Sequence, residues 1–166
     1  MTYLKYMSLL LVLLLSVTFA QTERPAWQSL ELTDARTGET FTLGGFEGKT
    51  VFVEPMATWC TNCRKQLGNV AEARAQAGEE VVFVALSVEG NLPDEQLAAY
   101  ADKENFDLTF AVATPELLQA LVDTFGRAVA SPPSTPHFLI YPDGTTSELT
   151  TGIEAPDTLL AQLNAE

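Results

Sequence analysis

The most informative stretch of the sequence is ATWCTNC, residues 57–63, which contains both cysteines of the 166-residue chain. An apolar run at 50–56 precedes it and predicts a strand, and the segment after Cys60 predicts a helix that ends at Gly78. At the start of a helix the unpaired backbone N–H groups and the helix dipole favour negative charge, so we expect the Cys60 sulfur to be stabilised as a thiolate. Cys63, one turn later, should point inward and attack a mixed disulfide on Cys60.

The cysteine pair has two other interpretations, a structural disulfide and a zinc site. A disulfide across this spacing closes only a short loop, which constrains the unfolded chain little. A structural zinc site needs four ligands, and the chain has only two cysteines and a single histidine, His137. We therefore expect redox chemistry at Cys60 and Cys63, with the disulfide itself as the redox group and no bound cofactor or metal.

Outside this motif, the chain alternates predicted strands and helices. We expect a hairpin in 27–43, strands near 81–88, 108–113 and 137–141, and a last strand through Leu149; helices are expected near 93–103, between Thr114 and Gly126, and near 156–163. This order predicts an α/β domain with a central mixed sheet and helices on both faces. No internal repeat or low-complexity linker requires a second domain. Pro55 removes a ladder donor, so we expect an irregularity within the strand at 50–56.

Residues 1–20 have the features of a secretory signal peptide. Lys5 precedes an apolar run at 7–17, and small side chains stand before a break after Ala20. An uncleaved membrane anchor is the alternative, although a spanning helix needs about 20 apolar residues. We expect residues 21–166 to form one exported domain in the periplasm or another extracytoplasmic space, where a disulfide can persist.

The charge of the chain limits its partners. There are 22 acidic and 9 basic side chains, which give a formal net charge of -13. Binding to a polyanion needs Lys and Arg to replace its counterions, so the composition argues against a nucleic-acid partner. We expect a monomer whose acidic residues form a soluble surface, which could also select basic partners.

In its motifs the chain resembles the thioredoxin superfamily, and in particular the exported TlpA/ResA-like thiol-disulfide oxidoreductases. The resemblance implies a thioredoxin-like fold with an N-terminal β-hairpin extension and a β/α insertion. It also implies that Cys60 is the attacking cysteine and Cys63 the resolving one. The matching segments are GKTVFV at 48–53, ATWC at 57–60 with Cys63, Thr135-Pro136, FLI at 138–140 and Asp143-Gly144.

The resemblance also implies roles for side chains outside the pair. Pro136 falls where the family has a cis proline beside the disulfide, which would leave the backbone of Thr135 free to pair with an extended substrate; an ordinary loop proline is the alternative. Trp59 is expected to cover the site and to contact the substrate. Glu54 lies where many thioredoxins have a buried acid, and burial would raise its pKa and let it exchange a proton with Cys63. The alternation along the strand also allows Glu54 to face solvent.

Three functions are considered. We favour an exported thiol-disulfide oxidoreductase that reduces exported cysteine-containing proteins, as in cytochrome c maturation, with electrons from a membrane thiol donor. A peroxiredoxin-like peroxidase has the pattern PxxxTxxC, and Pro55 and Thr58 precede Cys60 at other offsets. A copper-handling module would use Cys60, Cys63 and His137 as ligands. Arg64 and His137 are also candidates for tuning the thiolate.

Overall fold

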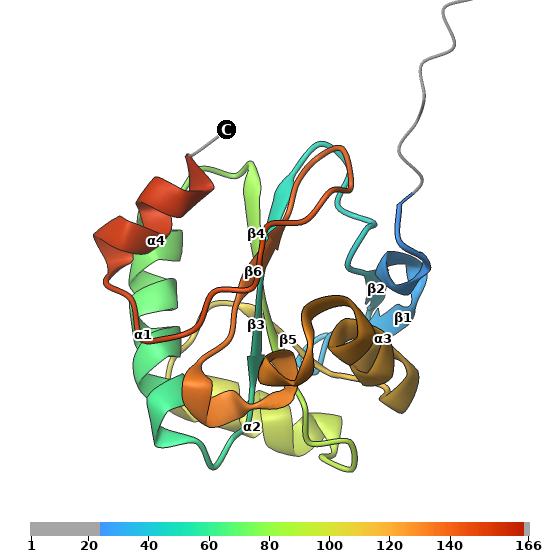
Figure 1. Ribbon diagram of the computed structural model, residues 1–166. Coiled ribbons are helices and arrows are strands. Elements are labelled where there is room, and N and C mark those ends of the chain that lie inside the picture. The colour runs from blue at the N-terminus through green and yellow to red at the C-terminus, as the bar shows by residue number, and fades with distance from the viewer. Residues whose placement is uncertain (1–23, 165–166) are drawn as a thin grey trace, which may run out of the picture.

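The computed structural model describes residues 24–164 (Figure 1). The signal peptide expected at 1–20 lies outside the described residues. Within 24–164, none of the helices has the length and apolar character needed to cross a membrane.

A four-stranded mixed sheet forms the centre of the molecule. Its strand order is β5-β4-β3-β6. Strands β3 (Thr50–Met56), β4 (Val81–Ser87) and β5 (Thr109–Val112) are parallel, and β6 (Phe138–Ile140) runs antiparallel to β3. Every residue of β3 is buried, as expected for a central strand that is covered on both faces. The sheet confirms the predicted α/β fold.

One face of the sheet packs against three helices, and a first hydrophobic cluster fills the space between them. This cluster combines the β3 side chains Phe52 and Met56 with Cys63 and Leu67 from the first of these helices. Figure 1 shows the sheet nearly edge-on, with α1 and α4 on its left. The three helices are α1 (Thr61–Gln76), α2 (Asp94–Lys103) and α4 (Pro156–Leu163).

The opposite face of the sheet is covered by α3 and by the N-terminal hairpin (Figure 1). Trp27 and Phe125 pack here against Phe138 of β6, with ring centroids 6.0 and 4.4 Å from the Phe138 ring. The hairpin confirms the expected extension before the first central strand. The elements on this face are η1 (Ala26–Ser29), β1 (Glu31–Thr33), β2 (Thr40–Thr42) and α3 (Pro115–Phe125).

Local sequence signals fix the ends of α3. The Thr114 hydroxyl accepts a hydrogen bond from the Leu117 backbone N–H at 3.1 Å, and Pro115 occupies the first turn. Gly126 ends the helix with φ of 79°, a conformation that favours glycine. Two short 3₁₀ turns, η2 (Arg127–Ala130) and η3 (Pro132–Ser134), then lead to β6.

The expected irregularity at Pro55 is absent, because β3 pairs with β4 without interruption from Thr50 to Met56. The pairing of β3 with β6 covers only Val51 to Val53. Alternate residues of β3 direct their N–H groups to opposite neighbouring strands, so the position of Pro55 faces the same side as Val51 and Val53, towards β6. The pairing with β6 ends at Val53, so an N–H group at Pro55 would have no partner in that strand. No ladder hydrogen bond is lost there.

The strand expected through Leu149 is reduced to two isolated bridges, which pair His137 with Thr150 and Ile140 with Thr146. Between them the Ser147 hydroxyl accepts a hydrogen bond from the Leu139 N–H at 2.9 Å. A side chain therefore replaces one backbone acceptor, and the segment does not form a regular ladder.

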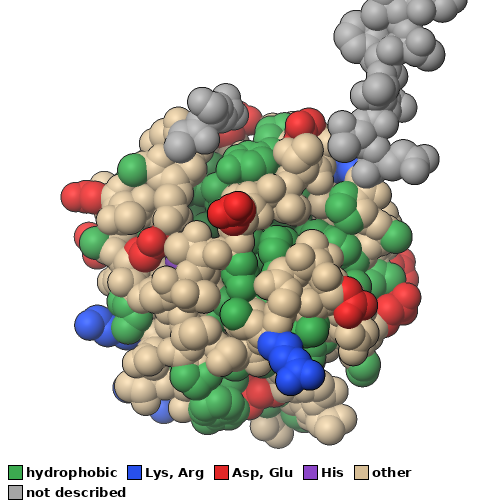
Figure 2. All heavy atoms as spheres, viewed as in Figure 1, with side chains coloured by type: hydrophobic (Ala, Val, Ile, Leu, Met, Phe, Trp, Pro, Cys, Tyr) green, Lys and Arg blue, Asp and Glu red, His purple; other side chains and the backbone are tan. Residues whose placement is uncertain are grey.

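Acidic side chains are spread over the face shown in Figure 2 rather than gathered in one patch. The net charge of -13 is therefore not concentrated in a single acidic patch on this face.

Candidate active site

The two cysteines lie where β3 leads into α1. The Cα atoms of Cys60 and Cys63 are 5.3 Å apart, and a disulfide joins the two side chains. Cys60 is the N-cap residue of α1, and its Sγ accepts a hydrogen bond from the Cys63 backbone N–H at 3.1 Å. In the reduced protein the same N–H group and the helix dipole would stabilise a Cys60 thiolate. The predicted strand-to-helix setting of the motif is thus confirmed.

The two sulfurs differ in their access to solvent. Cys63 is completely buried, whereas Cys60 is 4% exposed and lines a surface pocket of about 140 Å³. Trp59, Arg64 and Tyr100 form other parts of the pocket wall. Only Cys60 can therefore be reached from this pocket, while Cys63 faces the interior as expected.

A loop with three prolines lies against the disulfide. Cys63 Sγ is 3.1 Å from the Pro132 carbonyl oxygen, to which the reduced thiol could donate a weak hydrogen bond. The Asn62 side-chain amide donates to the Pro133 carbonyl at 2.9 Å. The first turn of α1 is thus fastened to the loop that precedes β6.

The prediction of a cis bond before Pro136 is wrong, since residues 24–164 contain no cis peptide bond. Thr135 instead adopts a left-handed conformation with φ of 46° and ψ of 59°, which turns the chain while the bond stays trans. The Thr135 N–H donates to the Pro132 carbonyl at 2.8 Å, so this donor is not free for a substrate. Thr135 is buried and its hydroxyl has no hydrogen-bond partner among the described residues.

Glu54 is completely buried in β3, which settles the choice between a buried and a solvent-facing side chain. It lies two residues from Phe52 and two from Met56, whose side chains belong to the cluster that includes Cys63. Neither carboxyl oxygen has a hydrogen-bond partner in the described part of the chain. Burial raises the pKa of Glu54 well above its ordinary value.

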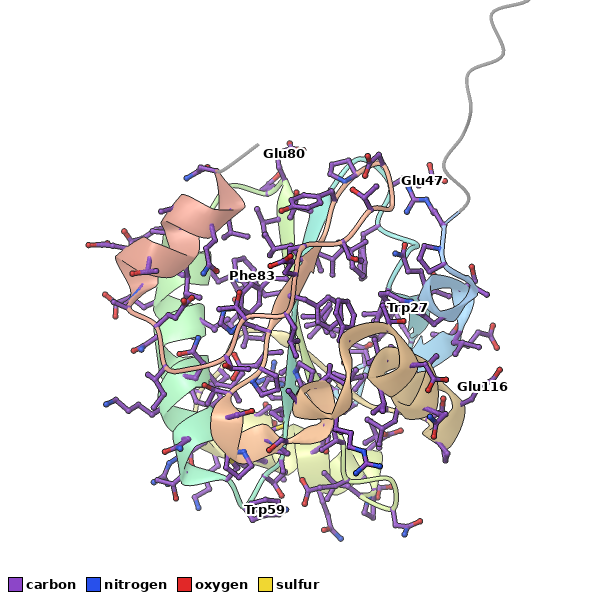
Figure 3. All side chains as sticks on the ribbon, viewed as in Figure 1. Trp27, Glu47, Trp59, Glu80, Phe83 and Glu116 are labelled. Carbon is purple, nitrogen blue, oxygen red and sulfur yellow. A yellow bond between two sulfur atoms is a disulfide. The ribbon has the colours of Figure 1, made fainter. Side chains whose placement is uncertain are left out.

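Trp59 projects from the end of the molecule at which α1 begins (Figure 3). Its side chain is 65% exposed, although it stands directly before Cys60 and lines the pocket beside it. An exposed tryptophan next to a reactive sulfur offers a large apolar surface to a partner. Trp59 is therefore exposed beside Cys60 and does not form a closed cover over the disulfide.

Glu89 is a site residue that the sequence analysis missed. Its carboxylate accepts hydrogen bonds from the Thr58 N–H at 2.6 Å and from the Thr58 hydroxyl at 3.2 Å. These contacts hold the turn that leads into Cys60. In the sequence, Glu89 stands just after the apolar run at 81–88. The carboxyl ends of neighbouring parallel strands meet at one edge of a sheet, so this position could have indicated that Glu89 lies near the cysteine motif.

The two residues considered for tuning the thiolate differ in their surroundings. His137 is buried and stacks on Phe52, and its Nε2 lies 3.1 Å from a carboxylate oxygen of Glu154. Arg64 is half exposed, lines the pocket beside Cys60 and makes a long ion pair of 3.8 Å with Glu104. Arg64 is therefore the one that lies at the pocket.

The ligand set considered for copper does not form a cluster. Across residues 24–164, no group of three or more His, Cys, Asp or Glu side chains is arranged to hold a metal ion. His137 is engaged with Glu154 instead of converging with Cys60 and Cys63.

Comparisons with known proteins agree with this geometry. The family model described as Redoxin matches residues 21–157. The thiol-disulfide oxidoreductase ResA of Oceanobacillus iheyensis is 27% identical over 172 residues, an alignment that covers 95% of this chain and 85% of ResA.

Two solved structures share the fold. The structure of dsbF from MTB, in its mixed oxidised and reduced forms, has a TM-score of 0.64 at 19% identity and covers 86% of this chain and 98% of its own. A secreted disulfide oxidoreductase of Mycobacterium tuberculosis, homologous to E. coli DsbE, has a TM-score of 0.60 at 18% identity; 84% of this chain and 97% of that one are covered. These similarities confirm the arrangement of strands and helices that the sequence predicts.

Proposed function

Because the chain belongs to the Redoxin family and is a thiol-disulfide oxidoreductase of the TlpA/ResA-like group of the thioredoxin superfamily, we propose that it reduces disulfides in exported proteins. The observation that carries this proposal is the hydrogen bond from the Cys63 N–H to Cys60 Sγ at the start of α1, beside a pocket that opens to the surface. This position favours a Cys60 thiolate that a substrate can reach.

The proposed reaction begins with the reduced pair. The Cys60 thiolate attacks one sulfur of a substrate disulfide, which forms a mixed disulfide and releases the other substrate sulfur as a thiolate. Cys63 then loses its proton and attacks Cys60 Sγ. This attack releases the second substrate sulfur and forms the Cys60–Cys63 disulfide. Two electrons pass from the pair to the substrate, whose two sulfurs take up the proton that Cys63 lost and a second proton from solvent.

Glu54 is proposed to accept the proton that Cys63 loses. The carboxyl is buried on the face of the sheet that packs against α1, in the same part of the core as Cys63. Burial raises the pKa of Glu54, which makes its carboxylate a stronger base for the proton of Cys63. The reacting groups are thus Cys60, Cys63 and Glu54, and the redox group is the cysteine pair itself.

We propose that the substrate segment lies across Trp59 and the loop at Thr135 and Pro136. The exposure of Trp59 supports this placement, as does the hydrogen bond between Asn62 and the Pro133 carbonyl, which brings the loop next to α1. Because the Thr135 N–H is engaged with Pro132, the loop would have to rearrange before that N–H could pair with a substrate.

The proposed setting is outside the cytoplasm, with residues 21–166 as the working domain, monomeric and without nucleic acid. The signal-like features of residues 1–20 support export. Exported proteins with cysteines, such as those that bind haem covalently, are the proposed substrates, and a membrane thiol donor would restore the reduced pair.

A trapping experiment tests the exchange with protein substrates. In Cys63→Ser the resolving sulfur is absent, so the partner should stay attached to Cys60 as a mixed disulfide that a reductant releases. Cys60→Ser is the matched control and should trap nothing. If Cys63→Ser captures no exported protein through Cys60, the proposal of a protein substrate is wrong.

A further inference from the structure

His137 is a buried histidine whose two ring nitrogens both face oxygen atoms. Its ring stacks on Phe52 and is shielded from solvent. Nδ1 lies 3.3 Å from the Thr135 carbonyl oxygen, and Nε2 lies 3.1 Å from a carboxylate oxygen of Glu154. A carbonyl oxygen can only accept a hydrogen bond, so Nδ1 must carry a proton to bond to Thr135. A carboxylate also only accepts, so a ring that satisfies both contacts is an imidazolium, whose charge Glu154 balances.

Thr135 connects this histidine to the resolving cysteine. The Thr135 N–H donates to the Pro132 carbonyl oxygen at 2.8 Å, and the same oxygen lies 3.1 Å from Cys63 Sγ. Each of these atoms is within hydrogen-bond distance of the next. An unbroken series of contacts therefore joins the Glu154 carboxylate, through His137 and the loop before β6, to the sulfur of Cys63.

The other end of this series is fastened to α1, the helix that begins at the cysteine motif. The Glu154 N–H donates to the Gln66 side-chain oxygen at 2.8 Å, and the Asn69 side-chain amide donates to the Glu154 carbonyl at 2.7 Å. Gln66 is completely buried and lies one turn after Cys63. Glu154 also directly precedes the loop into α4, which packs beside α1 (Figure 1). The contacts thus begin and end on one helix, so they fix the Pro132 carbonyl relative to Cys63.

We propose that His137, paired with Glu154, is a positioning residue for the resolving cysteine. Acting through Thr135, it holds the Pro132 carbonyl oxygen against Cys63 Sγ. This inference rests on the proposed function and adds a control on the resolving step. In the reduced protein the Cys63 thiol donates to this oxygen, which can only accept and therefore favours the thiol over the thiolate. The contact thus stabilises the reduced pair and slows the attack of Cys63 on a mixed disulfide.

Two substitutions of His137 separate its two contacts. In His137→Asn the side-chain amide can stand at the place of Nδ1 and donate to Thr135. In His137→Gln the longer amide can stand at the place of Nε2, where it reaches Glu154 instead. Both variants lose the ring that stacks on Phe52, so a purely structural effect should be the same in the two. The proposal predicts that only His137→Gln releases the Pro132 carbonyl from Cys63.

The S–H stretching band in the infrared spectrum reports on this contact directly. The chain has two cysteines, so in the Cys60→Ser background Cys63 is its only thiol. The band should lie at the position of a hydrogen-bonded thiol in this background and with His137→Asn added, and should move to the position of a free thiol with His137→Gln. A free thiol in the Cys60→Ser background, or the same band position in both His137 variants, would overturn the proposal.

The thiol-disulfide equilibrium with glutathione, measured with both cysteines present, gives the functional readout. Loss of the thiol hydrogen bond removes stabilisation from the reduced pair but not from the disulfide. His137→Gln should therefore shift the equilibrium at pH 7 towards the disulfide by about threefold, relative to His137→Asn. Equal equilibria in the two variants would contradict a role of Nδ1 in holding the loop.

Nitrogen NMR of the wild-type protein tests the first contact without any substitution. The chain has a single histidine, so the ring signals belong to His137. Nδ1 should carry a proton at pH 7, and an unprotonated Nδ1 would overturn the proposal even if both His137 variants failed to fold. Failure of the proposed function is distinguishable, because the trapping of exported proteins by Cys63→Ser does not depend on His137.

Discussion

Glu54 and Glu89 are two acids near the same cysteine motif, and their surroundings give them opposite properties. Glu89 accepts hydrogen bonds from Thr58 and from the Ser87 hydroxyl, which suits a carboxylate. Glu54 has no partner among residues 24–164 and lies in an apolar cluster, which favours the neutral acid. One acid therefore fixes the turn before Cys60, and the other is available for proton exchange.

Replacing Glu54 by Gln should make stability less sensitive to pH. Burial raises the pKa of Glu54 in the folded protein above its ordinary value of 4.5, so the folded state holds more protons than the unfolded state above that pH. The free energy of unfolding of the wild type should therefore fall as the pH rises from about 4.5 towards the pKa of Glu54 in the folded protein. The fall is about 1.4 kcal/mol for each pH unit by which the folded pKa exceeds the ordinary one. Glu54→Gln should lack this decline.

Urea unfolding at pH 4.5 and pH 8 measures the effect. The gain in stability of Glu54→Gln over wild type should be larger at pH 8. The exposed Glu47→Gln is the control and should show no such difference. An equal gain at both pH values would mean that Glu54 does not titrate differently in the folded protein.

Replacing Glu89 should loosen the turn before Cys60. Glu89→Ala removes the acceptor of the Thr58 N–H and should lower the free energy of unfolding by about 1.5–3 kcal/mol, the range for hydrogen bonds to a charged group. Glu89→Gln keeps one acceptor oxygen and should lose less. Denaturant unfolding of both variants checks the order; an unchanged stability in Glu89→Ala would show that Thr58 finds another acceptor.

At the level of elements, the ends of α3 follow from local sequence signals. Thr114, Pro115 and Gly126 predict where α3 begins and ends, and the structure agrees. The segment at 146–150 was less predictable, since its expected ladder is interrupted by the Ser147 side chain. Alternation of apolar residues indicates a strand, but it does not reveal that a hydroxyl will replace a backbone acceptor.

The same substitution at two glycines should have opposite effects. Gly68 lies on the exposed side of α1 with no atom close to an added Cβ, so Gly68→Ala should stabilise by about 0.5–1 kcal/mol. Gly126 also has open space but has φ of 79°, so Gly126→Ala should destabilise by about 1–3 kcal/mol. Thermal unfolding of the pair checks this. A stabilised Gly126→Ala would show that the backbone after α3 can relax.

For the whole molecule, the order of strands and helices was predictable because periodicity and turn residues act along the chain. The contacts at the site join residues that are far apart in the sequence, so they were harder to predict from it. Burial of Glu54 was expected from the resemblance, whereas Glu89 lies in the loop after β4 and carries no motif. The trans bond before Pro136 also depends on the left-handed turn at Thr135, which no local pattern required.

The reduction potential of the Cys60–Cys63 pair depends on the two sulfurs, on the start of α1 and on the fold around them. It is measured by equilibrating the protein with glutathione buffers of known composition and counting its free thiols. The proposed reductant should give a value near that of thioredoxin, about -270 mV. A value near -120 mV, as in a strong oxidant, would contradict the proposed direction, and a disulfide that does not exchange would contradict the redox role altogether.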